Sequence, residues 1–183
     1  HLKYEDGKLF KNIFQQLNLT QESNIGQGVG FTANGVYLIT GGFGGLGKLL
    51  TKRIIQQTKA TVILIGRREI AANDLQVFNA VNRSGADVVY QRCDVTSFEA
   101  VKLLIETVKQ RYGRINGIIH AAGVTRDAFL VNEQRDNWKQ VLAPKIDGVI
   151  NLDQALAEEN LDFFVLFSSI SAVTGNPGQS AYS

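Results

Sequence analysis

From residue 36 onward, short apolar runs alternate with longer stretches that are apolar on one side only. Five continuous runs of aliphatic and β-branched residues predict buried strands at 36–40, 61–65, 87–92, 117–120 and 163–167. The stretches between them predict a helix ending near residue 58, a polar helix-like segment to about 84, a helix capped by Ser97 and a long helix over 138–156. Apolar strands separated by helices favour parallel pairing with helices on both faces. The predicted fold is a doubly wound, Rossmann-like α/β sheet that binds ligands at the carboxyl ends of its strands.

The first 34 residues follow a different pattern. Asp6-Gly7 predicts a hairpin turn between two short strands, and residues 20–35 are rich in Gln, Ser, Asn, Thr and Gly, as linkers are. We therefore expect a boundary near residue 35, with 1–34 separate from the α/β domain of 35–183.

Composition excludes several classes of protein. Apolar residues make up 44% and charged residues 20% of 183 residues, which is typical of a soluble globular domain. A net charge of +2 gives no footprint for nucleic acid or a membrane surface, and no apolar run is long enough to span a bilayer. The single cysteine, Cys93, cannot form an internal disulfide and fits a reducing, cytoplasmic setting. Because the chain has no methionine and begins with His1, we interpret it as part of a longer protein, with the predicted sheet truncated at its C-terminal end.

A glycine-rich loop follows the first strand of the predicted sheet. Its residues are Gly41, Gly42, Phe43, Gly44, Gly45, Leu46 and Gly47, which satisfy both G-x-G-x-x-G and T-G-x-x-x-G-x-G spacings. Glycines let backbone amides approach a pyrophosphate, and the next helix directs its amino end at the negative charge. A loop between a strand and a helix is the context that indicates a dinucleotide site; the alternative is a purely structural turn.

The choice of dinucleotide depends on the residues after the second strand. NAD enzymes have Asp or Glu there to bind the ribose 2′-hydroxyl, whereas this chain has Arg67 and Arg68. A guanidinium can bind a 2′-phosphate bidentately, so the sequence favours NADPH. Two solvated arginines at a strand end are the alternative.

Several motifs in the second half of the chain resemble one family. His120-Ala121-Ala122-Gly123, the spacing of Ser169 and Tyr182, and the glycine loop resemble the short-chain dehydrogenase/reductase superfamily. Within it, Ala143–Gly148, Phe167–Ser169 and Gly178–Tyr182 resemble ketoreductase domains of modular polyketide synthases. The resemblance runs from about residue 35 to the end. It implies that residues 1–34 contain the end of a preceding structural subdomain plus a linker, and that 35–183 are the catalytic subdomain.

The resemblance also implies an activity and a catalytic set. The activity is NADPH-dependent reduction of a β-ketoacyl thioester on the phosphopantetheine arm of an acyl carrier protein, beside neighbouring synthase domains. Lys145, Ser169 and Tyr182 take the lysine, serine and tyrosine positions. A phenol has a free pKa of about 10, and a nearby ammonium stabilises the phenolate, while a serine hydroxyl can hold the substrate oxygen. Singly, each residue could be structural: a surface lysine, a strand-end serine, a half-buried aromatic.

The resemblance assigns further residues around the cofactor and substrate. Asp94 and Val95 would flank the adenine, although Asp94 could be a plain turn residue, and Ala121, Ala122 and Gly123 would line the cofactor channel. No metal is assigned. Asp127 is the final acid of the Leu-Asp-Asp motif of B-type domains, which give a D-hydroxyl; Thr125 and Arg126 replace its first two residues. Thr174 stands where A-type domains carry tryptophan. The alternative is that Asp127 is a solvated acid paired with Arg126.

Two rival functions are a free-standing short-chain reductase of fatty-acid type and a non-catalytic nucleotide-binding scaffold. The leader before residue 35 argues against the first, and the presence of Ser169, Tyr182 and Lys145 argues against the second. We expect the 183-residue segment by itself to be inactive.

Overall fold

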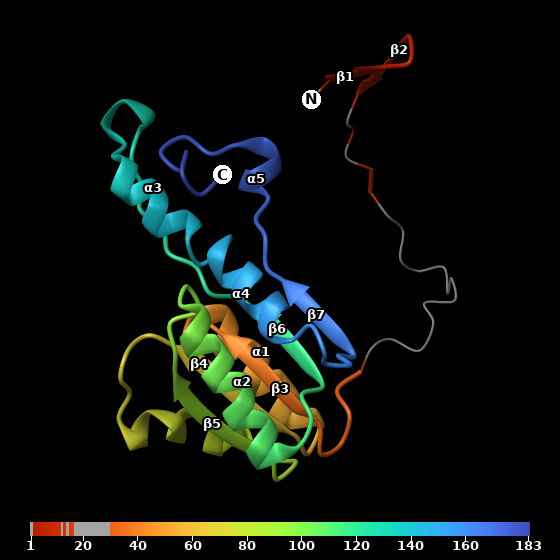
Figure 1. Cartoon of the computed structure of the whole chain (residues 1–183), viewed down its shortest axis with the longest axis vertical. Helices are drawn as coiled ribbons and strands as arrows, with labels where there is room; N and C mark the ends of the chain where they lie inside the picture. The colour runs from red at the N-terminus through yellow and green to blue at the C-terminus, as the bar shows by residue number, and fades with distance from the viewer. Residues whose placement is uncertain (1, 12, 14, 17–29) are drawn as a thin grey trace. The chain divides into compact units, whose positions relative to one another are not determined.

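The computed structural model describes the chain except residues 1, 12, 14 and 17–29 (Figure 1). It divides into two compact units, residues 1–30 and 31–183. In the first unit, β1 (Leu2–Glu5) pairs antiparallel with β2 (Lys8–Lys11). Asp6 and Gly7 join them with φ values of 49° and 76°, the backbone that a two-residue hairpin turn requires. The predicted hairpin is therefore present, while most of the predicted linker lies outside the described residues.

The second unit is built on a five-stranded parallel sheet. Its strands are β3 (Val36–Thr40), β4 (Thr61–Gly66), β5 (Asp87–Arg92), β6 (Gly117–His120) and β7 (Phe163–Leu166). The order in the sheet is β5-β4-β3-β6-β7, with every neighbouring pair parallel (Figure 1). The chain thus runs outward from β3 through β4 to β5 and then returns to the other side of β3 as β6, which places the carboxyl ends of β3 and β6 side by side. The prediction of a doubly wound parallel sheet is confirmed.

Helices cover both faces of this sheet, and each face has its own core. On one side, α2 (Phe98–Tyr112) and α4 (Asp147–Ala155) pack against each other and against Leu38 of β3. On the other, α1 (Gly45–Gln57) and the 3₁₀ segment η1 (Ala72–Val81) pack against Tyr37 and Ile39. Successive residues of β3 therefore face opposite cores, the period of two expected of a strand buried on both sides. Ser97 caps α2 as predicted, because its Oγ accepts a hydrogen bond from the Ala100 amide. Among the described helices, none has the length and apolar character needed to cross a membrane.

The predicted long helix over 138–156 is wrong. The structure has two helices there, α3 (Arg135–Leu142) and α4, separated by residues 143–146. Pro144 has no backbone N–H and its ring crowds the preceding turn, so the regular hydrogen-bond ladder cannot continue through it. The Gly148 amide instead donates to the Ala143 carbonyl, five residues earlier. Two further short helical segments, η2 (Leu130–Asn132) and α5 (Ser171–Thr174), complete the fold.

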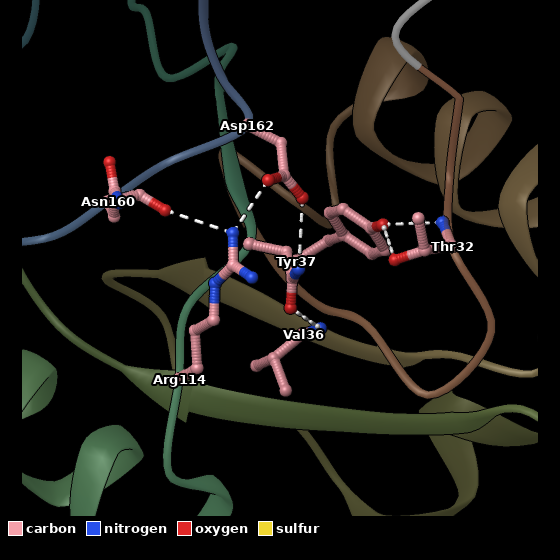
Figure 2. Close-up of polar contacts among 7 residues, drawn as sticks. Thr32, Val36, Tyr37, Arg114, Asn160 and Asp162 are labelled. Carbon is pink, nitrogen blue, oxygen red and sulfur yellow. Dashed lines mark hydrogen bonds and ion pairs between the residues drawn. The ribbon is translucent and has the colours of Figure 1, made fainter.

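A polar network ties the amino ends of β3, β6 and β7 together, at the edge opposite the glycine loop (Figure 2). Asn116 accepts from the Val36 amide at 3.0 Å and donates to Asp162 at 2.9 Å. Arg114 donates to the same carboxylate at 2.6 Å and to the Asn160 carbonyl at 3.1 Å. Side-chain hydrogen bonds therefore hold the three strands together at their amino ends. The candidate site lies at the other edge, where the strands end at their carboxyl ends.

Candidate active site

Three glycines of the loop after β3 are required by the packing of the loop itself. Gly41 has φ +66°, and a Cβ there would lie 2.8 Å from the Ala121 carbonyl oxygen. A Cβ on Gly42 would lie 2.7 Å from the Leu64 Cβ, and one on Gly47 would lie 2.6 Å from the Gly41 carbonyl oxygen. A side chain at Gly41 or Gly42 would push the loop away from Ala121 or Leu64, and one at Gly47 would clash with the backbone of the loop itself.

Gly45 is different, because a Cβ there would meet no atom within 4 Å. Gly45 opens α1, and this helix start has no side-chain cap and no acidic residue in its first turn. Gly44 and Leu46 beside it are exposed. Uncapped amides at a helix amino end bind anions, and an open glycine lets a phosphate approach the backbone closely. The loop therefore fits the pyrophosphate of a dinucleotide.

The ring of Phe43, at the middle of the loop, is in contact with two cationic side chains. The Lys48 Nζ and the Arg68 guanidinium each lie 5.1 Å from the centre of its ring, within the range of a cation–π contact. Phe43 is itself set edge-on against Tyr90, whose hydroxyl donates to the Arg68 carbonyl at 2.6 Å. Basic side chains thus gather where the chain leaves β4, which favours binding of a phosphate.

A pocket opens between the loop and the ends of β4, β5 and β6. It is lined by residues assigned above to the cofactor: Gly41, Arg67, Asp94, Val95, Ala122 and Gly123. Ala121 lies beside it, with its amide bonded to the Thr40 carbonyl. The Oδ1 atom of Asp94 accepts hydrogen bonds from the Thr96 amide and from the Thr96 hydroxyl. Asp94 therefore shapes its turn, as the structural alternative proposed, and also lines the pocket.

Cys93 also lines this pocket and is buried. Burial, reinforced by the neighbouring Asp94 carboxylate, raises the pKa of its thiol to about 11. The thiol is therefore protonated at neutral pH and is not a nucleophile.

Lys145, Ser169 and Tyr182 line a second pocket, of about 210 Å³, next to the carboxyl end of β7. The Ser169 Oγ lies 2.6 Å from the Ser171 Oγ and accepts from the Ser171 amide at 3.2 Å, so it also shapes the turn into α5. Within the described residues, no hydrogen bond joins the Tyr182 hydroxyl to Ser169 or Lys145. The structure thus brings the three side chains to one pocket.

Lys145 lies in the break between α3 and α4, and it is half-buried. Its Nζ donates to the Phe167 carbonyl at 3.0 Å, and its Cε would lie 3.3 Å from a Cβ on Gly123. Burial lowers the pKa of this ammonium. The alternative of a surface lysine on a helix is therefore not what the structure has.

Two buried side chains, Thr40 and His120, were given no functional role from the sequence, although His120 opens the His120–Gly123 motif. The Thr40 Oγ1 accepts from the Ala122 amide at 3.1 Å and lies 2.8 Å from Nδ1 of His120. Nε2 of His120 lies 2.8 Å from the carbonyl oxygen of Pro144. Burial, together with the nearby Lys145 ammonium, lowers the pKa of His120 even though the bond to Pro144 acts in the opposite direction.

Asp127 is tied to the segment that carries Tyr182. Gln179 donates through Nε2 to both carboxylate oxygens, at 3.2 Å each, and Ala128 forms a parallel bridge with Gln179. No ion pair between Asp127 and Arg126 occurs in the described part of the chain. Gln179 is a further residue that sequence reasoning missed; it lies in the Gly178–Tyr182 motif, but its partner is 52 positions away.

The fold is that of a Rossmann-like α/β domain with two pockets at the carboxyl edge of its sheet. Residues 35–183 match the KR domain family, and the chain belongs to that family.

Curated relatives come from polyketide synthases. The chain is 48% identical to polyketide synthase PksN of Bacillus subtilis (strain 168) over 150 residues, which are 81% of this chain and 3% of PksN. It is 34% identical to PksL of the same organism over all of this chain and 4% of PksL. The chain thus spans a small fraction of the relatives that it matches.

The solved structures that resemble this chain include two ketoreductases from assembly lines. A ketoreductase domain from the bacillaene assembly line matches with a TM-score of 0.79 and 36% identity, over 99% of this chain and 42% of that one. An N-terminal ketoreductase from the macrolactin assembly line matches with a TM-score of 0.78 and 38% identity, over 96% and 33%. NAD⁺-bound xylitol dehydrogenase matches with a TM-score of 0.70 and 25% identity, over 82% and 58%.

Proposed function

We propose that this chain is the catalytic part of a ketoreductase that uses NADPH to reduce a β-ketoacyl thioester to a β-hydroxyacyl thioester in polyketide biosynthesis. The observation that carries the proposal is the convergence of Lys145, Ser169 and Tyr182 on one pocket at the carboxyl edge of the sheet. The pocket beside the glycine loop and the uncapped start of α1 support a dinucleotide site at the same edge.

The three side chains divide the work on the ketone oxygen. When bound, the nicotinamide supplies the hydride that adds to the ketone carbon. Negative charge then builds on the oxygen, and the Tyr182 hydroxyl donates the proton that neutralises it. Ser169 donates a hydrogen bond to the same oxygen through Oγ, and the Lys145 ammonium stabilises the phenolate that Tyr182 becomes. An ammonium that is half-buried interacts more strongly with a phenolate than a solvated one would.

The cofactor preference rests on the residues after β4. Arg67 lines the dinucleotide pocket, and Arg68 is held over Phe43 beside the phosphate loop. No carboxylate follows β4 until Glu69, which pairs with Arg92. Cations in place of an acid favour a 2′-phosphate over a 2′-hydroxyl, so NADPH is the proposed cofactor rather than NADH.

The substrate is proposed to arrive on the phosphopantetheine arm of an acyl carrier protein, beside other synthase domains. The similarity to PksN and PksL supports this, since both are named as polyketide synthases. The family match from residue 35 supports assigning 35–183 to the catalytic subdomain and 1–34 to the end of a preceding structural subdomain with its linker.

The test is a single-turnover assay with the full-length protein. A β-ketoacyl thioester on a purified carrier protein is mixed with NADPH, and formation of the β-hydroxy product is followed by mass spectrometry. Product formation with NADPH supports the proposal. Binding of NADPH without turnover would instead indicate a scaffold, and equal rates with free and carrier-bound thioesters would indicate a free-standing type of reductase.

A further inference from the structure

His120 is buried at the last position of β6, and both of its ring nitrogens have partners. It lines neither the dinucleotide pocket nor the pocket of Lys145, Ser169 and Tyr182. A buried histidine with two short hydrogen bonds is held rigidly, so the groups to which it is bonded are held as well.

The hydrogen-bond partners of His120 determine which of its ring nitrogens carries a hydrogen. A carbonyl oxygen only accepts, so Nε2 must carry the hydrogen that is donated to Pro144. The Thr40 hydroxyl accepts from the Ala122 amide and has its own proton left to donate to Nδ1. A neutral imidazole with its hydrogen on Nε2 satisfies every group in this chain of bonds. The lowered pKa of His120 agrees with a neutral ring at physiological pH.

The Pro144 carbonyl is available only because the helix is interrupted. In a continuous helix this oxygen would accept from the Gly148 amide, but that amide donates to Ala143. A Cβ on Gly148 would also lie 3.4 Å from the Cε1 of His120, so the imidazole fits closely against the start of α4. His120 therefore fills the place of the missing helical donor.

The residue after Pro144 is Lys145, and its ammonium is held at one further point, the Phe167 carbonyl at 3.0 Å. We propose that His120 is a positioning residue for Lys145: its bond to the Pro144 carbonyl fixes the interrupted helix against β6 and so sets where the ammonium lies relative to Tyr182. The inference rests on the proposed function, since it assigns His120 to the machinery of ketone reduction. A chain of hydrogen bonds thus runs from Ala122, which lines the dinucleotide pocket, through Thr40 and His120 to the backbone next to Lys145.

Substitutions at position 120 separate this role from simple packing. His120→Leu removes both bonds, His120→Asn is too short to reach Pro144, and the terminal amide of His120→Gln can take the place of Nε2–H. In the full-length protein, His120→Leu and His120→Asn are expected to bind NADPH as wild type does but to lose about 10- to 100-fold in kcat, since small displacements of a catalytic group have effects of that size. His120→Gln is expected to recover most of the rate.

The pH profile of the reverse reaction, oxidation of a β-hydroxyacyl thioester, gives a readout that packing alone would not move. Among the described residues, the titratable side chains that line this pocket are Lys145 and Tyr182, and His120 is bonded to the residue before Lys145. A displaced ammonium stabilises phenolate less, so the rising limb of the profile should shift to higher pH in His120→Leu and return in His120→Gln.

Asn116→Leu is the matched control, because Asn116 lies just before β6 and accepts from the first residue of β3, at the opposite ends of the strands that Thr40 and His120 close. It should lower stability and leave kcat and the pH profile unchanged. Wild-type kcat and pH profile in a folded His120→Leu would overturn the inference. If that variant does not fold, equal rates for His120→Gln and His120→Asn would overturn it. Inactive wild-type protein would count against the proposed function instead.

Discussion

The Lys145 ammonium donates to the carbonyl oxygen of Phe167, 3.0 Å away, at the point where the chain leaves β7. This bond joins the break between α3 and α4 to the segment that leads to Ser169. Lys145 lies outside the regular turns of α3 and α4, in the segment between them. The interruption at Pro144 therefore places a cation in the pocket, at the expense of burying part of its charge.

The cost of that burial should be measurable as a pH dependence of stability. Because the pKa of Lys145 is lowered in the folded state, the unfolded chain binds more protons between the folded and unfolded pKa values. The free energy of unfolding that Lys145 contributes therefore rises with pH through that interval. Relative to Lys145→Met, wild type should gain stability as the pH rises toward the ordinary lysine pKa of about 10.4, and the gain should level off above it. Denaturant titrations at several pH values check this; a constant difference would contradict it.

Tyr182→Phe removes the proposed proton donor and keeps the ring. NADPH should bind as in wild type, while kcat for ketone reduction should fall by about 100-fold or more, the usual contribution of a general acid. Stopped-flow fluorescence measures both quantities. Tyr90→Phe is a matched control, because it loses a hydroxyl bonded to the Arg68 carbonyl and leaves the catalytic pocket untouched. Turnover of Tyr182→Phe at more than half of the wild-type rate would remove Tyr182 from the mechanism.

The glycine loop offers a matched pair of substitutions. A Cβ on Gly47 would lie 2.6 Å from the Gly41 carbonyl oxygen, so Gly47→Ala should lower the unfolding temperature. A Cβ on Gly45 meets no protein atom, and alanine is the better helix former, so Gly45→Ala should fold at least as well as wild type. If the space at Gly45 is kept for a phosphate, Gly45→Ala should still weaken NADPH binding by about tenfold, equivalent to one lost hydrogen bond. Unchanged affinity in Gly45→Ala would show that the space serves no ligand.

Most of the fold could be predicted from the sequence, because a strand buried on both faces is a continuous apolar run. Val36–Thr40 and Gly117–His120 are of this kind, and their pairing follows from the alternation with helices. The break at Pro144 was missed because apolar spacing reports side chains and not the backbone donor that proline lacks. The partners of His120 were missed for another reason. Thr40 lies 80 positions away and becomes a neighbour only through strand pairing.

The candidate site also divides into features that local sequence patterns predict and contacts that form only in the folded chain. The glycine loop and the Ser169–Tyr182 segment are local patterns, and the structure places both at the carboxyl edge of the sheet. The link between Gln179 and Asp127 is not local, since it joins two loops that meet only in the folded chain. Local motifs could therefore be predicted, and the contacts that position them could not.

Cofactor selectivity should depend on Arg67. Removing one charge-assisted contact to a phosphate should weaken NADPH binding by about tenfold or more in Arg67→Ala, with little effect on NADH. Titrations of both cofactors into wild type and variant measure the two ratios. Arg53→Ala, in the middle of α1, is a control for the loss of one positive charge. A wild-type protein that binds both cofactors equally would refute the preference for NADPH.

Stereochemical outcome is the last prediction, and it depends on the bond between Gln179 and Asp127. The Asp127 carboxylate is exposed, and Gln179 holds both of its oxygens three positions before Tyr182. An acid fixed there can direct the phosphopantetheine arm to one side of the pocket, so that one face of the ketone meets the hydride. The resemblance of Asp127 to the last acid of the B-type motif leads us to expect the D-β-hydroxy product.

A ratio of 99:1 needs a difference of only about 2.7 kcal/mol between the two faces, because each 1.36 kcal/mol is tenfold in rate. Asp127→Ala should therefore lower the stereochemical ratio more than the rate. Gln179→Leu should do the same, since it keeps the acid but releases it. Arg126→Ala is the control, because Arg126 makes no ion pair with Asp127 in the described residues. Chiral chromatography of the reduced thioester gives the ratio for each protein; a predominantly L product from wild type would refute the assignment, and an unchanged ratio in Gln179→Leu would show that the bond does not set it.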